Sequence, residues 1–114
     1  MEERRTARRI PVTFRASFSL RPEGAGEGTI VDLTARGCCV ESPIPVPVTT
    51  HLELRLELSL GERPILVDLA AVRWVRGSHM GVEFLSLRPE HQVRLLRIID
   101  QGQEGGSLRR IGDD

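Results

Sequence analysis

The stretch HLELRLELSL, residues 51–60, decides the class of fold. It alternates leucine with mostly polar residues over its whole length. A period of two places every leucine on one face of an extended chain, which is typical of a half-buried β-strand. Residues 11–20 alternate in the same way, and their apolar positions are Val12, Phe14, Ala16, Phe18 and Leu20.

Turn signals divide the rest of the chain into short segments that favour a β structure. Four further strands are expected at residues 29–33, 38–41, 65–74 and 79–85. The adjacent Ala70 and Ala71 break the alternation of their strand, which indicates a β-bulge. Pro43, Pro45 and Pro47 cannot donate backbone hydrogen bonds, so this part predicts a connector over the surface.

Beyond residue 88 the apolar residues recur at helical spacing. Val93, Leu96 and Ile99 form one stripe, which Leu95 and Ile98 flank. Six short strands followed by one helix predict a mainly β fold, namely a small six-stranded antiparallel β-barrel with a C-terminal α-helix as its lid. The helix is then expected to cover part of the core.

The chain is long enough for one domain only, with 114 residues. We expect residues 1–10 to form a flexible arginine-rich arm and residues 11–102 to form the barrel and its helix. Pro89 suits the first turn of that helix and Gly102 suits its end. Residues 103–114 contain little apolar material and are expected to be disordered.

Composition excludes several classes of protein. Sixteen basic and sixteen acidic residues give a net charge of zero, so the chain lacks the overall field of a protein that binds nucleic acid polymers. No apolar run is long enough for a membrane span, and the N-terminus has no apolar leader. Cys38 and Cys39 are adjacent and have no other partner, which favours a reducing, cytoplasmic setting.

Catalytic and metal sites are not indicated. His51, His79 and His91 are scattered without the spacing of metal ligands. No nucleophile, base and orienting group can be assembled, so the chain is not expected to be an enzyme or to hold a cofactor or metal. The only tryptophan, Trp74, is expected in the core or against the helix rather than as a platform for base stacking. The sequence leaves open whether the chain is a monomer or a homodimer.

Two polar clusters stand out from this scaffold. The arm carries four arginines, namely Arg4, Arg5, Arg8 and Arg9. An antiparallel hairpin of the first two strands would place Asp32 opposite Ala16 and Gly37 opposite Pro11. The turn at residues 34–37 would then lie beside the end of the arm, and the two clusters would meet at one rim of the barrel.

Such a meeting would suit a guanine nucleotide with exposed phosphates. Arginine matches the O6 and N7 acceptors of guanine, and its flat face stacks on a purine. A carboxylate such as Asp32 accepts hydrogen bonds from N1 and N2 at the opposite edge of the base. Further arginine charge, the hydroxyl of Thr34 and backbone amides near Gly37 suit the phosphates.

The motifs at these positions resemble those of the PilZ domains, bacterial receptors for cyclic diguanylate (cyclic di-GMP). Residues 3–12, ERRTARRIPV, are similar to the family's RxxxR motif through Arg5 and Arg9, although the frame Arg4 to Arg8 also fits. Residues 32–37, DLTARG, resemble its second motif, [D/N]xSxxG, with threonine in place of the usual serine. The segments VRWV at residues 72–75 and GVEF at residues 81–84 add a weaker resemblance.

This resemblance implies a split barrel of the PilZ type and a receptor for cyclic di-GMP. It assigns the ligand contacts to Arg4, Arg5, Arg8, Arg9, Asp32, Thr34 and Gly37. The arm would order over one or two ligand molecules and signal to an unidentified downstream effector protein. The alternative is an adaptor with the same fold that binds other proteins but not the nucleotide.

Overall fold

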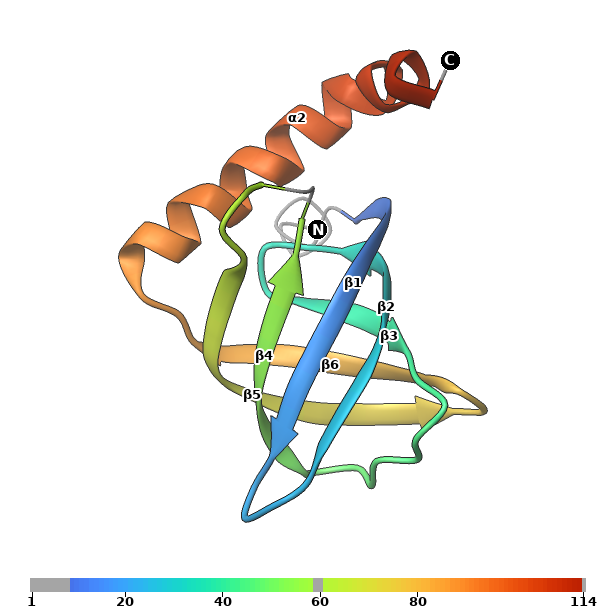
Figure 1. The fold of residues 1–114 in the computed structure, drawn as a ribbon, viewed down its shortest axis with the longest axis vertical. Coiled ribbons are helices and arrows are strands. Elements are labelled where there is room, and N and C mark those ends of the chain that lie inside the picture. The colour runs from blue at the N-terminus through green and yellow to red at the C-terminus, as the bar shows by residue number, and fades with distance from the viewer. Residues whose placement is uncertain (1–8, 59–60, 114) are drawn as a thin grey trace, which may run out of the picture.

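The computed structural model describes residues 9–58 and 61–113, with side chains up to Gln101. In this part of the chain, six antiparallel strands form one closed barrel in the order β1-β2-β3-β6-β5-β4, and a single helix follows (Figure 1). The elements are β1 (Ile10–Leu20), β2 (Ala25–Leu33), β3 (Gly37–Glu41), β4 (His51–Glu57), β5 (Ile65–Arg76), β6 (His79–Ser86) and α2 (Pro89–Asp113). The predicted fold class is confirmed.

The core fills the barrel as the period-two pattern predicts. In β4, Leu52, Leu54 and Leu56 are at most 2% exposed, and the residues between them face outward. In β1, Ala16 and Phe18 are buried in the same way. Burying a leucine or phenylalanine side chain contributes about 1.5–3 kcal/mol, so this alternation supplies most of the drive for closure.

The register of the first hairpin differs from the prediction. Asp32 pairs with Pro11 rather than with Ala16, and Gly37 pairs with Glu83 of β6 rather than with Pro11. The reason is a shorter turn, which the backbone of Leu20 closes by donating a 2.8 Å hydrogen bond to the carbonyl of Gly24. Residues 25–28, which the sequence analysis places in the turn, therefore belong to β2. The new register brings Asp32 closer to the end of the arm.

Strand β5 contains the expected break in alternation. Its pairing with β6 shifts between Leu69 and Ala70 and again between Val72 and Trp74. The second shift inserts Arg73 as an extra residue. Val72 therefore stays in the core, while Arg73 and Trp74 are both exposed on the outside.

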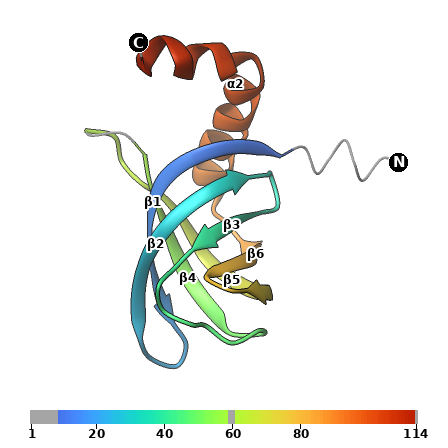
Figure 2. The same cartoon turned by 90° about the vertical axis from the view of Figure 1, so that its right-hand side faces the viewer.

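Helix α2 begins at Pro89 as predicted, but it presents a different stripe to the barrel. Leu95 and Ile99 are buried, whereas Val93 and Leu96 are about half exposed at 52% and 45%. The helix lies across the end of the barrel at which β1 begins (Figures 1 and 2). No helix in the described part of the chain is long and apolar enough to cross a membrane.

Contacts with the start of β5 and the turn before it explain the orientation of α2. The backbone N–H of Leu66 donates to Nδ1 of His91 at 3.2 Å, and the Arg94 guanidinium donates to the carbonyls of Arg63 and Pro64. These bonds fix which side of the helix faces inward. They give His91 a structural role in the first turns of α2.

The end of α2 also differs from the prediction. Gly102 was expected to end the helix, but α2 continues through it to Asp113. Glycine costs about 1 kcal/mol inside a helix, yet its backbone still donates and accepts the helical hydrogen bonds. The disorder expected for residues 103–114 stays a prediction.

Candidate functional site

A cleft of about 450 Å³ lies on the outside of the barrel where β2, β3, β6 and β5 run side by side. Cross-strand pairing places Asp32, Cys39, Gly81 and Trp74 in one row across these four strands. Residues in one such row share a face of the sheet. Figure 2 shows the start of β1, the turn between β2 and β3, and strands β5 and β6 on the same side of the barrel.

The last arginine of the arm, Arg9, lies beside Asp32 at this cleft, as the sequence predicts. Arg9 Nε lies 4.0 Å from Asp32 Oδ1, and both residues line the cleft. Asp32 pairs with Pro11, two residues after Arg9, so the hairpin itself brings the two charges together. The other three predicted arginines, Arg4, Arg5 and Arg8, lie outside the described residues.

Thr34 holds the turn between β2 and β3 through its hydroxyl. The backbone N–H groups of Arg36 and Gly37 both donate to Thr34 Oγ1 at 3.0 Å. The backbone of Thr34 also donates to the Gly37 carbonyl at 2.8 Å. A threonine hydroxyl makes these bonds as well as a serine hydroxyl does, so the substitution relative to the family motif preserves the turn. Thr34 thus caps this turn through its hydroxyl.

Gly37 is required by a close approach between strands. A Cβ added at this position would overlap the backbone carbonyl oxygen of Val82 on β6. The neighbouring Arg36 carbonyl accepts a 2.8 Å hydrogen bond from the backbone of Phe84. Gly37 therefore lets the turn pack directly against β6, and this packing forms one end of the cleft.

Trp74 lines the cleft, so its expected place in the core or against the helix is wrong. It is 39% exposed, and its indole lies directly on Gly81, where any side chain would overlap Nε1. The Arg76 guanidinium carbon lies 5.2 Å from the centre of the indole ring, a cation–π contact. The bulge at Arg73 turned this residue outward, and neither the alternation nor the composition indicates where a bulge changes the face.

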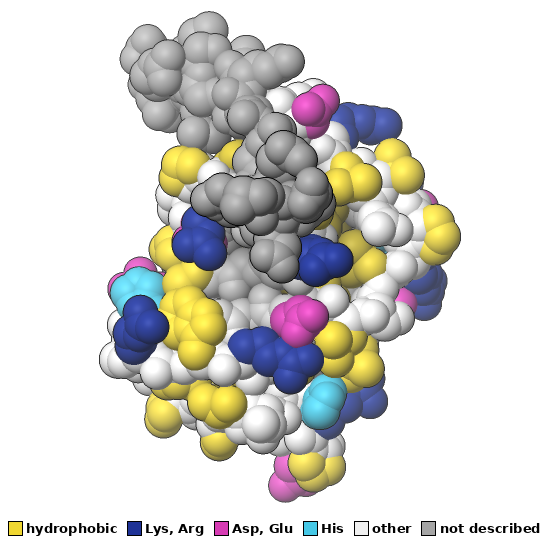
Figure 3. Space-filling model, turned by 180° about the vertical axis from the view of Figure 1, so that it is seen from behind, with side chains coloured by type: hydrophobic (Ala, Val, Ile, Leu, Met, Phe, Trp, Pro, Cys, Tyr) yellow, Lys and Arg dark blue, Asp and Glu magenta, His cyan; other side chains and the backbone are white. Residues whose placement is uncertain are grey.

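Positive charge exceeds negative charge in the cleft. Four arginines and two carboxylates line it, which gives a formal excess of two positive charges. Arg73 Nε and Glu83 Oε1 form a 2.6 Å ion pair, and Arg9 lies near Asp32, so Arg36 and Arg76 supply the excess. Figure 3 shows this side of the molecule, with dark blue arginines gathered around a magenta acidic side chain.

The two cysteines are buried, are not disulfide bonded and differ in surroundings. Both lie along the cleft, but Cys38 also belongs to the hydrophobic core, whereas Cys39 does not. Burial raises the pKa of the Cys38 thiol far above its usual range, and burial also raises the pKa of Cys39. Neither is an activated nucleophile. Among the described residues, no three His, Cys, Asp or Glu side chains group as a metal site would require.

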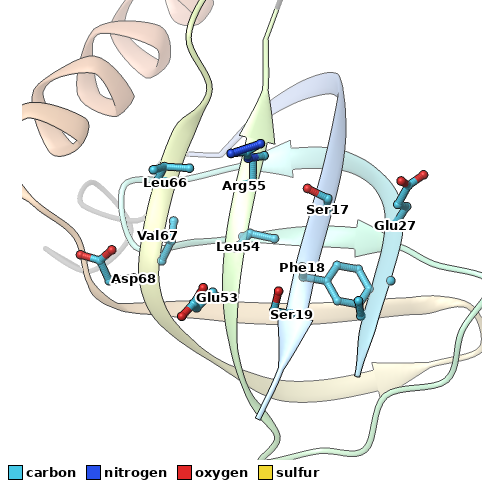
Figure 4. A pocket seen from close by; sticks show the side chains of 12 residues that line it. Ser17, Phe18, Ser19, Glu27, Glu53, Leu54, Arg55, Leu66, Val67 and Asp68 are labelled. Carbon is cyan, nitrogen blue, oxygen red and sulfur yellow. The ribbon is translucent and has the colours of Figure 1, made fainter. Parts of the chain in front are cut away.

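A larger depression of about 620 Å³ lies on the outer face of β2, β1, β4 and β5 (Figure 4). None of the predicted ligand residues lines it. Figure 4 shows small serine side chains from β1 between Glu27 on one side and Glu53 and Arg55 on the other. With Asp68 its lining holds three carboxylates and one arginine, a charge that disfavours an anionic ligand.

Comparison with known proteins bears on the family and the fold of the chain. A family model described as the PilZ domain matches residues 3–101. Comparison with curated protein sequences finds no match.

Several solved structures share the fold. The PilZ domain of CeSA from a cellulose-synthesizing bacterium has a TM-score of 0.64 at 17% identity, covering 82% of this chain and 95% of that one. The PilZ domain of YcgR from Escherichia coli, solved with c-di-GMP, has a TM-score of 0.71 at 15% identity, covering 97% and 98%. The Bacillus subtilis motility inhibitor MotI/DgrA has a TM-score of 0.71 at 19% identity, covering 88% of this chain and 51% of that one. The match to the family model extends from the arm to the helix, and the chain therefore belongs to the PilZ domain family.

Proposed function

We propose that this PilZ domain is a receptor for cyclic di-GMP, which binds in the cleft beside Arg9, Asp32 and Trp74. The observation that carries the proposal is the Arg9–Asp32 pair, 4.0 Å apart, in a cleft with two excess positive charges. Cyclic di-GMP carries two phosphodiester charges, so the charges of ligand and cleft balance. The structure of the YcgR PilZ domain with c-di-GMP supports the same ligand.

Each group in the cleft matches one part of the ligand. Asp32, with a side chain 26% exposed, can accept hydrogen bonds from N1 and N2 of a guanine. Arg9 can contact the O6 and N7 edge of the base or a phosphate, and Arg36 supplies further charge for phosphate. Trp74 and the guanidinium of Arg76 offer flat surfaces for base stacking.

Thr34 and Gly37 act indirectly in this proposal. The Thr34 hydroxyl already accepts from two backbone amides, and Gly37 is needed for the contact with β6. We propose that both residues shape the turn that positions Asp32 and Arg36, rather than contact the ligand. Their replacement should therefore affect folding and binding together.

The motif residues Arg5 and Arg9, with Arg4 and Arg8 as helpers of the same sign, would close over the bound ligand. Ordering of the arm would then expose or hide a surface that an effector protein recognises. No bond of the ligand is broken in this event. Incubation of the protein with cyclic di-GMP should return the dinucleotide unchanged.

Calorimetric titration of the full chain with cyclic di-GMP tests the proposal. A dissociation constant of one micromolar or lower is expected, which corresponds to about 8 kcal/mol. Arg9→Ala should weaken binding by about 1–3 kcal/mol, while Arg15→Ala, an exposed arginine of β1 outside the cleft, serves as the matched control. Higher salt should weaken binding by the wild type.

Two results would contradict this function. Absence of binding by the wild-type chain would leave the adaptor that interacts only with proteins. Full affinity in both Arg5→Ala and Arg9→Ala would refute the proposed contacts of these two arginines with the ligand, while the proposal that the domain binds cyclic di-GMP would stand.

A further inference from the structure

We propose that the cleft recognises both guanine bases of a cyclic dinucleotide, with Glu83 accepting hydrogen bonds from the second base. The inference rests on the function proposed above, because it assigns further contacts in the same cleft. Its starting observation is that the cleft holds two carboxylates, Asp32 on β2 and Glu83 on β6, on either side of β3. The ligand likewise carries two guanines, one on each side of its phosphodiester ring.

Sheet geometry places the two carboxylates farther apart than the hydrogen-bonding edge of one base can span. Asp32 pairs with Cys39 and Glu83 pairs with Gly37, so their partners on β3 are two residues apart. With strands about 4.8 Å apart and about 3.3 Å per residue, their backbones lie about 12 Å apart on one outer face. One base cannot meet both carboxylates at its hydrogen-bonding edge, whereas two bases of one ligand can meet one each.

Glu83 retains the capacity to accept hydrogen bonds. Its Oε1 accepts from Arg73 Nε at 2.6 Å, and a carboxylate offers about four lone-pair sites. The side chains of Arg73 and Glu83 are 52% and 44% exposed, so a ligand can reach them. Arg73 is a positioning residue here, since it holds the carboxylate in place through one lone pair of Oε1 and leaves lone pairs on both oxygens to accept from a base.

Guanine suits this carboxylate better than adenine. The Watson–Crick edge of guanine presents two adjacent donors, N1–H and N2–H, to the two carboxylate oxygens. Adenine presents the acceptor N1 at that edge, which would face a negative oxygen without a proton between them. A carboxylate that gives up its hydrogen bonds to water on ligand binding, and gains none from the ligand, lowers the affinity for that ligand considerably. Glu83 is thus expected to select the base as well as hold it.

Trp74 lies close enough to contact the same base. It follows Arg73 directly, and the bulge leaves both residues on the outside. Its indole covers Gly81, which precedes Glu83 by two residues on the same face of β6. A base held by Glu83 would therefore lie beside the indole and the Arg76 guanidinium.

The alternative role for Glu83 is purely structural. Exposed ion pairs between neighbouring strands contribute at most about 1 kcal/mol to folding, and Arg73–Glu83 could be one of these. A structural role predicts that removing the charge affects every ligand equally. Base recognition predicts an effect that depends on which base faces Glu83.

The test compares cyclic di-GMP with the 3′,3′-linked hybrid cyclic GMP–AMP, which has one guanine and one adenine. Wild-type protein should bind cyclic di-GMP about tenfold more tightly than the hybrid. Glu83→Gln should weaken cyclic di-GMP binding about tenfold, leave hybrid binding nearly unchanged and so abolish the preference. Glu53→Gln is the matched control, because Glu53 forms a 2.7 Å ion pair with Arg21 outside the cleft.

Each outcome decides between the two proposals. Equal affinity of the wild type for both ligands, or an equal loss for both in Glu83→Gln, overturns the second guanine site while the receptor function stands. Absence of binding of either ligand by the wild type overturns the receptor function and this inference with it. The wild-type comparison of the two ligands needs no variant, so a poorly folded Glu83→Gln protein would not prevent a decision.

Discussion

The indole of Trp74 lies directly on Gly81, and no larger residue fits beneath it. This contact holds a large aromatic side chain flat on the outside of the barrel, next to the Asp32 and Glu83 carboxylates. The cleft therefore has an aromatic wall, and its position depends on the absence of a side chain on the neighbouring strand.

Gly81→Ala should displace the indole without unfolding the barrel. The three atoms nearest to the added methyl all belong to the Trp74 side chain, which is partly exposed and can rotate away. We expect a red-shifted tryptophan emission, weaker binding of cyclic di-GMP and a stability change within about 1 kcal/mol. Trp74 is the only tryptophan, so intrinsic fluorescence reports on this position alone. An unchanged emission spectrum would contradict the contact.

Gly37→Ala should be much more damaging than the same change at Gly81. Its methyl would overlap the backbone carbonyl of Val82, and a backbone atom between paired strands cannot rotate away. We expect a loss of about 3 kcal/mol in the free energy of unfolding, the upper end of the usual range for overpacked sites. Urea denaturation of the two glycine variants side by side measures the difference. Equal stability of the two would show that the turn can move off β6.

Thr34→Val should weaken the turn, whereas Thr34→Ser should preserve it. Valine has the shape of threonine but leaves the amides of Arg36 and Gly37 without their acceptor. Because the turn is partly exposed, water can replace part of this bonding, and a cost of about 1–2 kcal/mol is expected. Chemical denaturation of both variants provides the measurement. A valine variant as stable as the serine variant would argue against hydroxyl capping.

Stability should fall in alkaline solution because of the two thiols. Burial raises the pKa of Cys38 and of Cys39, so the unfolded chain loses these protons at lower pH than the folded chain does. Stability is then fully present below the unfolded thiol pKa of about 8.5 and decreases as the pH rises beyond it.

The composition makes this alkaline effect unusually clean. The sequence has no lysine and no tyrosine, so the cysteines are the only side chains with ordinary pKa values in this range. Melting temperatures between pH 7 and about 10.5 should decline for the wild type and stay flatter for Cys38→Val with Cys39→Ser. An identical decline in both proteins would assign the effect to another group, such as the N-terminal amine.

Much of the architecture could be predicted because it follows from local pattern. The alternation around Leu54 and Phe18 specifies which face is buried, and that requirement alone leads to a small barrel. The meeting of Arg9 with Asp32 was also accessible, because a hairpin must return along its own path. The exact register of the hairpin could not be predicted, because it depends on how many residues form the turn.

The aromatic wall of the cleft could not be predicted in the same way. Trp74 is a large apolar residue of the kind that is usually buried. Its exposure results from one extra residue, Arg73, in the pairing of β5 with β6. Whether an inserted residue turns the following side chain outward depends on the partner strand, far away in sequence. The position of Glu83 in the cleft likewise depends on a contact that is distant in sequence, namely its pairing with Gly37.

Closure of the strand order from β1 round to β4 has a consequence for how an effector could recognise this domain. Each of the six described strands has a neighbour on both sides, and backbone without a ladder partner is confined to short stretches at strand ends, such as residues 25–28 of β2 and 73–76 of β5. Strand addition, the route by which many signalling modules bind extended peptides, would therefore have only these short stretches to pair with. Recognition of the domain by an effector would then depend mainly on side chains on the outer surface of the barrel or on helix α2. A scan for interface residues should start with these side chains.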